Sequence, residues 1–163
     1  MVDIGRMGDG HRQYNATPTE CAALAQRFDL VAIKRLEADL ALKADGPVMT
    51  AQGRMIADIV QACAVSGEDL PVSINAPLSF RFVPEQNHRP DEELELNEAD
   101  CDEIAYKGTA FDVGEAVAQS LFLAIDPFAI GPQAEAARKK AGILDESALS
   151  PFAALAALKP KAP

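Results

Sequence analysis

The chain is poor in aromatic and basic side chains. Among its 163 residues it has no tryptophan, two tyrosines and seven phenylalanines, and its fifteen lysines and arginines are outnumbered by 25 aspartates and glutamates. The formal net charge is −10 and the isoelectric point is near 4.6. Nonspecific affinity for nucleic acid comes from a basic surface, so the overall composition argues against a general nucleic-acid-binding protein.

Long apolar runs and cysteine pairs are also missing. No apolar stretch approaches the roughly 20 residues that cross a bilayer, and Met1 is not followed by a basic stretch and an apolar signal core, so we expect a cytoplasmic protein. The three cysteines, Cys21, Cys63 and Cys101, are widely spaced, which favours free thiols over a disulfide framework. With no CxxC, no HxxxH and only two histidines, we expect no metal and no cofactor.

No catalytic motif is present. The glycine-rich stretch 5–10 lacks the GxGxxG spacing of a phosphate-binding loop, and the chain has neither GxxxxGK[ST] nor GxSxG. Acid–base carboxylates need rigid, partly buried positions that shift their pKa values, whereas a run of charges is usually a solvated surface. We therefore expect no enzymatic activity.

Negative charge is concentrated in residues 85–103, which we call the acidic segment. It contains nine acidic residues and one arginine, so it carries −8 of the net −10. A like-charged block flanked by hydrophobic patterns is typical of a solvated loop on a folded domain. Such a loop would bind a cationic partner, and the partner-binding residues that we predict in it are Glu92, Glu93, Glu95, Glu98 and Asp100.

Periodicity predicts the first half of the fold. The segment from Thr17 to Glu20 has the spacing of a capping box with proline at the first helical position, and it predicts a helix from Pro18 to Phe28. Alternation of apolar and polar residues predicts three strands joined by short turns, at residues 36–42, 48–62 and 71–82. Gly53 predicts a bulge or bend, and Pro71 and Pro77 place part of the third strand at a sheet edge or at a bulge.

The second half of the chain predicts one strand and three helices. Residues 104–111 predict a returning strand, and Asp112 with Glu115 has the spacing of a second capping box. It begins a helix at residues 113–125 that ends before Pro127. Shorter helices are predicted at residues 132–141 and from Ser150 onward, the last of them bearing Phe152, Leu155 and Leu158. Residues 1–4 read as a remnant of a first strand and residues 5–10 as a loop.

These elements predict one α+β domain, an antiparallel meander sheet with two packed helices. The predicted domain covers residues 1–130, including the acidic segment, and residues 131–163 form a tail with short helices.

Four segments, in order along nearly the whole chain, resemble a known family: residues 16–30 (ATPTECAALAQRFDL), 53–72 around Gln61-Ala62-Cys63, 111–127 (FDVGEAVAQSLFLAIDP) and 150–159 (SPFAALAALK). Together they are similar to the alphaproteobacterial type of the YceD family, the large ribosomal RNA subunit accumulation proteins. The resemblance implies a factor needed for normal accumulation of the large-subunit ribosomal RNA. It also implies a gene beside that of a small, basic large-subunit ribosomal protein.

The resemblance points to Cys63 as a family-related position. Many relatives carry a CxxC where this chain has Cys63 and Ser66, and some carry further cysteines or histidines near the end, a pattern suggestive of a metal. Because Cys63 stands alone here, the metal is not carried over to this chain. Cys63 is most simply a small buried residue at a strand end.

The charge of the acidic segment and the resemblance to the YceD family together lead to one hypothesis about function. A non-enzymatic factor would support ribosome assembly by binding a basic ribosomal protein or a pre-ribosomal particle through the acidic segment, with ribosomal RNA contacted indirectly and no membrane involved. Phe152 and Leu155 would add a hydrophobic anchor, unless the tail packs back on its own sheet. Direct binding of ribosomal RNA by a basic sheet face is the alternative, and an RNA-processing enzyme is the third. The candidate cations of such a face are Arg27, Lys34, Arg35, Arg54 and Arg81.

Overall fold

Strands dominate the described part of the chain. The computed structural model describes residues 2–3, 9–85, 103–108 and 110–142. Its elements, in chain order, are β1 (Val2–Asp3), β2 (Gly10–Asn15), α1 (Pro18–Arg27), β3 (Ala32–Asp45), β4 (Val48–Ala62), β5 (Asp69–Pro84), β6 (Glu103–Tyr106), β7 (Ala110–Phe111), α2 (Val113–Ala124) and α3 (Ala134–Lys140).

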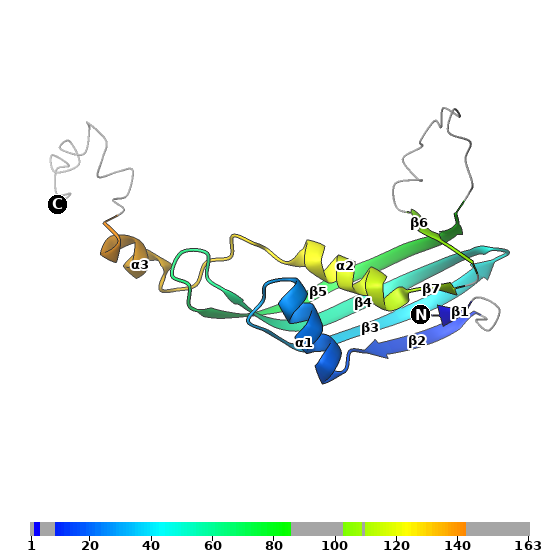
Figure 1. Ribbon diagram of the computed structural model, residues 1–163, viewed down its shortest axis with the longest axis horizontal. Coiled ribbons are helices and arrows are strands. Elements are labelled where there is room, and N and C mark those ends of the chain that lie inside the picture. Colours follow the sequence, from blue (N-terminus) through cyan, green and yellow to red (C-terminus); the bar gives the residue numbers. More distant parts are fainter. Residues whose placement is uncertain (1, 4–8, 86–102, 109, 143–163) are drawn as a thin grey trace, which may run out of the picture. The chain divides into compact units, whose positions relative to one another are not determined.

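The main sheet has five strands in the order β2-β3-β4-β5-β6 (Figure 1). The predicted meander is present as β3, β4 and β5, and the bounds predicted for the second strand are those of β4. The β3–β4 hairpin closes with Asp45 opposite Val48, and Gly46 in its turn has a φ of 58°. A positive φ at this position suits glycine, and the hairpin confirms the short turn predicted between the first two strands.

Two features of the sheet differ from the prediction. First, β5 and β6 pair in parallel, with Arg81 opposite Glu103, so the sheet is mostly and not wholly antiparallel. A parallel pair needs a crossover of a dozen or more residues, and the chain between Pro84 and Glu103 has that length. Second, the predicted returning strand is two strands, because β7 leaves the main sheet and pairs with β1.

Strand β2 was not predicted. It forms one edge of the sheet and pairs antiparallel with β3 from Gly10–Leu42 to Asn15–Glu37. Its sequence, GHRQYN, has no alternation of apolar and polar residues, and all of its side chains but that of Tyr14 are exposed. A strand that pairs through its backbone without a buried face leaves no hydrophobic pattern in the sequence.

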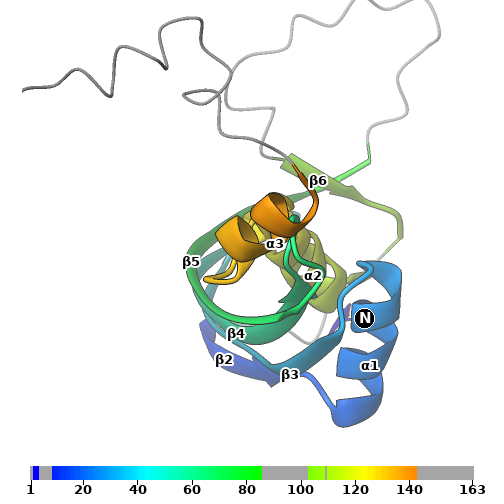
Figure 2. The ribbon, with the colours of Figure 1, turned by 90° about the vertical axis from the view of Figure 1, so that its left-hand side faces the viewer.

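Both main helices lie on the same face of the sheet, which curls around α2 (Figure 2). Helix α1 has the predicted capping box: Thr17 Oγ1 accepts from the backbone N–H of Glu20, and Glu20 Oε2 accepts from that of Thr17. Asp112 caps α2 by accepting from the N–H of Glu115 at 3.2 Å. The helices and the sheet enclose one core, whose largest fully buried members include Leu40, Met55, Phe82 and Leu121.

The chain separates into two compact units. The first contains Met1–Gln61 and Pro71–Asp126, and it holds the hydrophobic core. The second contains Ala62–Leu70 and Pro127–Pro163; its described part consists of the loop after β4, the start of β5 and helix α3. Among the described residues, no helix is long and apolar enough to span a membrane.

Candidate functional site

The acidic segment joins β5 to β6, and both of its ends are described. Arg81 Nε lies 3.0 Å from Glu103 Oε1, and Lys107 Nζ lies 3.3 Å from Glu85 Oε2. These pairs hold the two ends of the segment to neighbouring strands. The predicted partner-binding residues all lie outside the described residues and stay predictions: Glu92, Glu93, Glu95, Glu98, Asp100, Phe152 and Leu155.

Three of the five cations proposed for a basic sheet face, Arg27, Arg35 and Arg81, form ion pairs with carboxylates. Arg35 Nε donates to Asp58 Oδ2 at 2.8 Å, and Arg35 also lies 3.6 Å from Glu37. The pKa of Asp58 is lowered by the hydroxyl of Ser73, which donates to Oδ1 at 2.7 Å, and then by Arg35.

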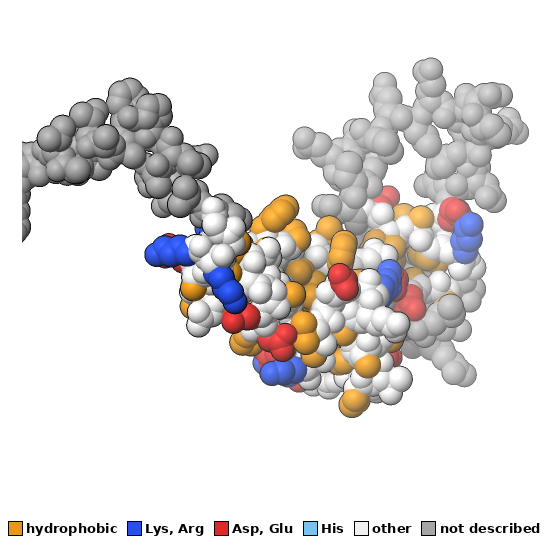
Figure 3. Space-filling model, turned by 60° about the vertical axis from the view of Figure 1, so that its left-hand side comes forward, with side chains coloured by type: hydrophobic (Ala, Val, Ile, Leu, Met, Phe, Trp, Pro, Cys, Tyr) orange, Lys and Arg blue, Asp and Glu red, His pale blue; other side chains and the backbone are white. Residues whose placement is uncertain are grey.

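The other two proposed cations are Lys34 and Arg54. Arg54 stands directly opposite Asp39 in the β3–β4 register, and Lys34 adds to the field that lowers the pKa of Asp58. On the face drawn in Figure 3, lysine and arginine side chains are separated from one another, and several lie beside acidic ones. Charges of both signs are therefore mixed among the described strands, and two of the sheet's arginines, Arg35 and Arg81, are paired with carboxylates.

A bidentate ion pair joins the two main helices. Arg27 donates from Nη1 and Nη2 to the carboxylate of Glu115 at 2.8 and 2.7 Å. These hydrogen bonds are the main cause of the lowered pKa of Glu115. The sequence predicted that Glu115 would take part in a capping box with Asp112. The ion pair with Arg27 of α1 was not predicted, because the two residues are far apart in the chain.

The thiol of Cys63 lies in the second unit, in the loop after β4. Only 4 % of Cys63 is exposed, and its Sγ accepts from the backbone N–H of Gly131 at 3.3 Å and of Ser66 at 3.4 Å. The hydrogen bond from Gly131, followed by those from Ser66 and Val65, lowers the pKa of Cys63 from 9.0 to about 6, although burial acts in the opposite direction.

Backbone hydrogen bonds tie the same two segments together. Ala64 N–H donates to the carbonyl of Ala129 at 3.0 Å, and Gly67 N–H donates to that of Cys63 at 2.9 Å. Within the described residues, no three histidine, cysteine, aspartate or glutamate side chains gather in a way that would hold a metal ion. The thiol thus faces backbone amides, whose hydrogen bonds favour its anionic form.

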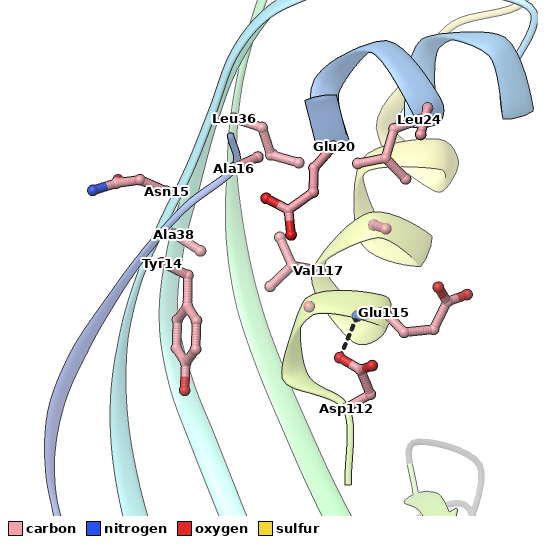
Figure 4. A pocket seen from close by; sticks show the side chains of 13 residues that line it. Tyr14, Asn15, Ala16, Glu20, Leu24, Leu36, Ala38, Asp112, Glu115 and Val117 are labelled. Atoms are coloured by element: carbon pink, nitrogen blue, oxygen red, sulfur yellow. Dashed lines mark hydrogen bonds between the residues drawn. The ribbon is translucent and has the colours of Figure 1, made fainter. Parts of the chain in front are cut away.

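A pocket of about 350 Å³ lies between α1, α2 and the strands β2 and β3. Its walls include Leu24, Leu36 and Val117, and Figure 4 shows the carboxylate of Glu20 turned into it while that of Glu115 points away. The ring of Tyr14 forms another wall, and its hydroxyl oxygen is enclosed with no hydrogen-bond partner among the described residues. This pocket was not predicted from the sequence. Its residues come from four elements, and the packing of distant elements leaves no local pattern in the chain.

Taken together, the described residues define an α+β protein that presents charged and apolar surfaces. Comparison with protein families gives a match to the family described as large ribosomal RNA subunit accumulation protein YceD, over residues 51–159. This match covers about two thirds of the chain, and the chain belongs to the YceD family. The searches of curated proteins and of solved structures found no match.

Family membership confirms the resemblance read from the sequence and implies involvement in accumulation of the large-subunit ribosomal RNA. The matched part begins within β4 and includes Cys63, the acidic segment and α2. Elements β2, α1 and β3 precede it, so the resemblance noted at residues 16–30 lies outside the match.

Proposed function

We propose that this protein is a non-enzymatic factor of the cytoplasm that supports large-subunit ribosomal RNA accumulation and ribosome assembly by binding a basic ribosomal protein through the acidic segment. The observation that carries the proposal is the placement of −8 formal charges in one connection between β5 and β6. In the described strands, Arg35 and Arg81 are already paired with carboxylates.

Charge favours a protein partner over RNA. Phosphates repel a segment of nine carboxylates, whereas lysine- and arginine-rich protein tails are attracted to it. The described sheet face offers no continuous basic area that would reverse this preference. The partner is therefore expected to be a polycation, and ribosomal RNA would be reached through it.

An acidic loop of this kind would neutralise its partner until RNA replaces it. The attraction is screened by salt: the Debye length falls from about 30 Å at 0.01 M to about 8 Å at 0.15 M ionic strength. Association is therefore expected to be fast and to weaken as salt is added. Release to ribosomal RNA would follow from the higher charge density of the phosphate backbone.

The test compares two variants of the full chain that lose the same charge in different places. One neutralises Glu92, Glu93, Glu95 and Glu98 to glutamine. The control neutralises Asp45, Glu68, Asp69 and Glu135 to the corresponding amides. The ligands are RNA-free large-subunit ribosomal proteins in one arm and protein-free large-subunit ribosomal RNA in the other.

The parent and the control variant are expected to bind the basic proteins, and the acidic-segment variant to lose that binding. None of the three is expected to bind the RNA alone. Equal binding of basic proteins by both variants would overturn the proposal. Direct binding of protein-free RNA by the parent would replace it with the RNA-binding alternative.

A further inference from the structure

The pocket of about 350 Å³ between α1, α2, β2 and β3 has an apolar floor and a rim that reaches solvent. The floor consists of side chains that are 3–6 % exposed, namely Leu36, Ala38, Val117 and Ala118. The rim includes exposed residues of α1 and of the start of α2, among them Glu20, Ala23 and Gly114. Ligand pockets usually measure about 300–1,000 Å³, so this cavity suits a ligand as small as one side chain that enters from solvent.

Three carboxylates line the pocket among the described residues, and that of Glu20 is the one placed to receive a cation. Glu115 is paired with Arg27 and points away from the cavity, and Asp112 caps the first turn of α2. The carboxylate of Glu20 is turned into the pocket (Figure 4). Hydrogen bonds from Thr17, above all the one from its backbone N–H, lower the pKa of Glu20, so the group is an anion at neutral pH.

The capping box uses one of the two carboxylate oxygens of Glu20. The backbone N–H and the hydroxyl of Thr17 both donate to Oε2, each at 2.8 Å, and no hydrogen bond within the described part of the chain reaches Oε1. A guanidinium is held best by both oxygens of a carboxylate, whereas an ammonium is a compact charge that one acceptor can hold. The remaining oxygen therefore favours an ammonium group.

We propose that this pocket binds the side chain of a lysine presented by the protein partner. The ammonium would lie at Glu20 Oε1, and the methylenes of the stem would lie against the apolar floor. A lysine side chain combines an apolar stem with a charged head, and the pocket offers an apolar floor with a carboxylate at its rim. The inference deepens the proposed function, on which it rests, by adding a site that recognises one lysine of the basic partner through its stem and its charge.

The probe for the test is an acetylated, amidated peptide of glycines with one central lysine. Three further peptides carry, in place of that lysine, norleucine, which keeps the stem without the charge, diaminobutyrate, which keeps the charge and lacks two methylenes, or arginine. Binding is followed by amide chemical shifts of the isotope-labelled full chain, which separate the pocket from the acidic segment. The lysine peptide is expected to shift amides at residues 14–24 and 112–118.

The pocket is expected to bind the lysine peptide more tightly than the other three. The loss of charge in norleucine is expected to weaken binding about two- to fivefold, as for a solvent-exposed ion pair. The loss of two methylenes in diaminobutyrate is expected to weaken binding about fivefold or more, because less apolar surface is buried. Equal affinity for lysine and norleucine, or tighter binding of arginine, would contradict the assignment to an ammonium.

Ala23→Leu tests the cavity itself. Ala23 is an exposed residue of α1 that lines the pocket, so a leucine there narrows the entrance while the core is unchanged. Ala22→Leu is the matched control, because Ala22 is also exposed and is not among the residues that line this pocket. Leucine is a strong helix former, so both variants are expected to fold. Ala23→Leu is expected to weaken binding of the lysine peptide about fivefold or more, and Ala22→Leu to leave its affinity unchanged.

Glu20→Gln tests the position of the ammonium. Glutamine can take the same part in a capping box, so the variant loses the charge and keeps the helix start. It is expected to lower the affinity for the lysine peptide about two- to fivefold and to leave that for the norleucine peptide unchanged. Glu135→Gln, at an exposed position of the second unit, is the control and is expected to leave both affinities unchanged. An equal effect of Glu20→Gln on both peptides would mean that the ammonium does not lie at Glu20.

The outcomes distinguish this inference from the proposed function. If Ala23→Leu and Ala22→Leu bind the lysine peptide equally, or if shifts occur only in the acidic segment, the pocket inference is wrong and the acidic-segment proposal is unaffected. If neutralising Glu92, Glu93, Glu95 and Glu98 leaves binding of ribosomal proteins unchanged but Ala23→Leu weakens the lysine peptide, the pocket inference stands and the acidic-segment proposal fails.

Discussion

Gly53 lies in β4 opposite Leu40 of β3, where the sheet leaves no room for a side chain. A Cβ built at this position would stand 1.8 Å from the carbonyl oxygen of Asp39 and 2.9 Å from its carbonyl carbon. Ordinary carbon–oxygen contacts between neighbouring strands are about 3.3–3.6 Å. Because the atoms in the way are backbone of the adjacent strand, the clash cannot be relieved by turning a side chain.

Gly53→Ala therefore requires β3 and β4 to separate by more than an ångström at the middle of their pairing. Overpacking inside a well-packed region typically costs about 1–3 kcal/mol, and backbone displacement adds to it. We expect the free energy of unfolding to fall by about 3 kcal/mol or more, out of the usual 5–15 kcal/mol. For a chain of this size the melting temperature would fall by about 6–12 °C.

The measurement is thermal and urea unfolding of the full chain followed by circular dichroism. Gly10→Ala in β2 is the matched control, since a Cβ at Gly10 meets nothing within 4 Å. We expect its melting temperature to stay within about 2 °C of the parent, in line with surface substitutions. A melting temperature for Gly53→Ala as close to the parent as that of Gly10→Ala would refute the steric argument.

Two further predictions concern buried polar atoms. Tyr14→Phe removes a hydroxyl that is enclosed with no partner in the described part of the chain, so urea unfolding is expected to show unchanged or higher stability, by up to about 1 kcal/mol. A clear loss of stability would mean that the hydroxyl has a stabilising contact. Cys63→Ala removes an acid whose folded pKa of about 6 lies below its ordinary value of 9.0. The stabilisation by Cys63 is therefore complete above about pH 9, declines as the pH falls and is absent below about pH 6. The difference in unfolding midpoint between parent and variant should be larger at pH 8.5 than at pH 5.5, and a difference independent of pH would contradict the assigned pKa.

Local patterns predicted elements whose stability is encoded within a few neighbouring residues. The Thr17–Glu20 capping box and the alternation along β4 and β5 specify their structures in this way, because capping hydrogen bonds and a buried strand face impose period and spacing. Strand β2 was not predicted, because its position depends on backbone pairing with β3.

The candidate functional features also differ in whether the sequence could predict them. The charge of the acidic segment is a property of composition, and no fold is needed to recognise that it favours a cationic partner. The contact between Arg27 and Glu115 spans 88 residues, and the one between Cys63 and Gly131 spans 68. Contacts at such separations leave no periodic mark in the chain, so neither was predicted.

The sequence by itself determined the α+β class, the meander, the two packed helices and the concentration of negative charge, since each rests on local periodicity, on capping or on composition. The resemblance to the YceD family also came from the sequence, through segments that match the family. Tertiary structure alone decided that β5 and β6 run parallel, that Arg35 and Arg81 of the sheet form ion pairs with carboxylates, and that α1, α2, β2 and β3 line a pocket of about 350 Å³. These properties arise when segments distant in the chain are brought together, and the free energy that selects them comes from packing and charge pairing across those distances.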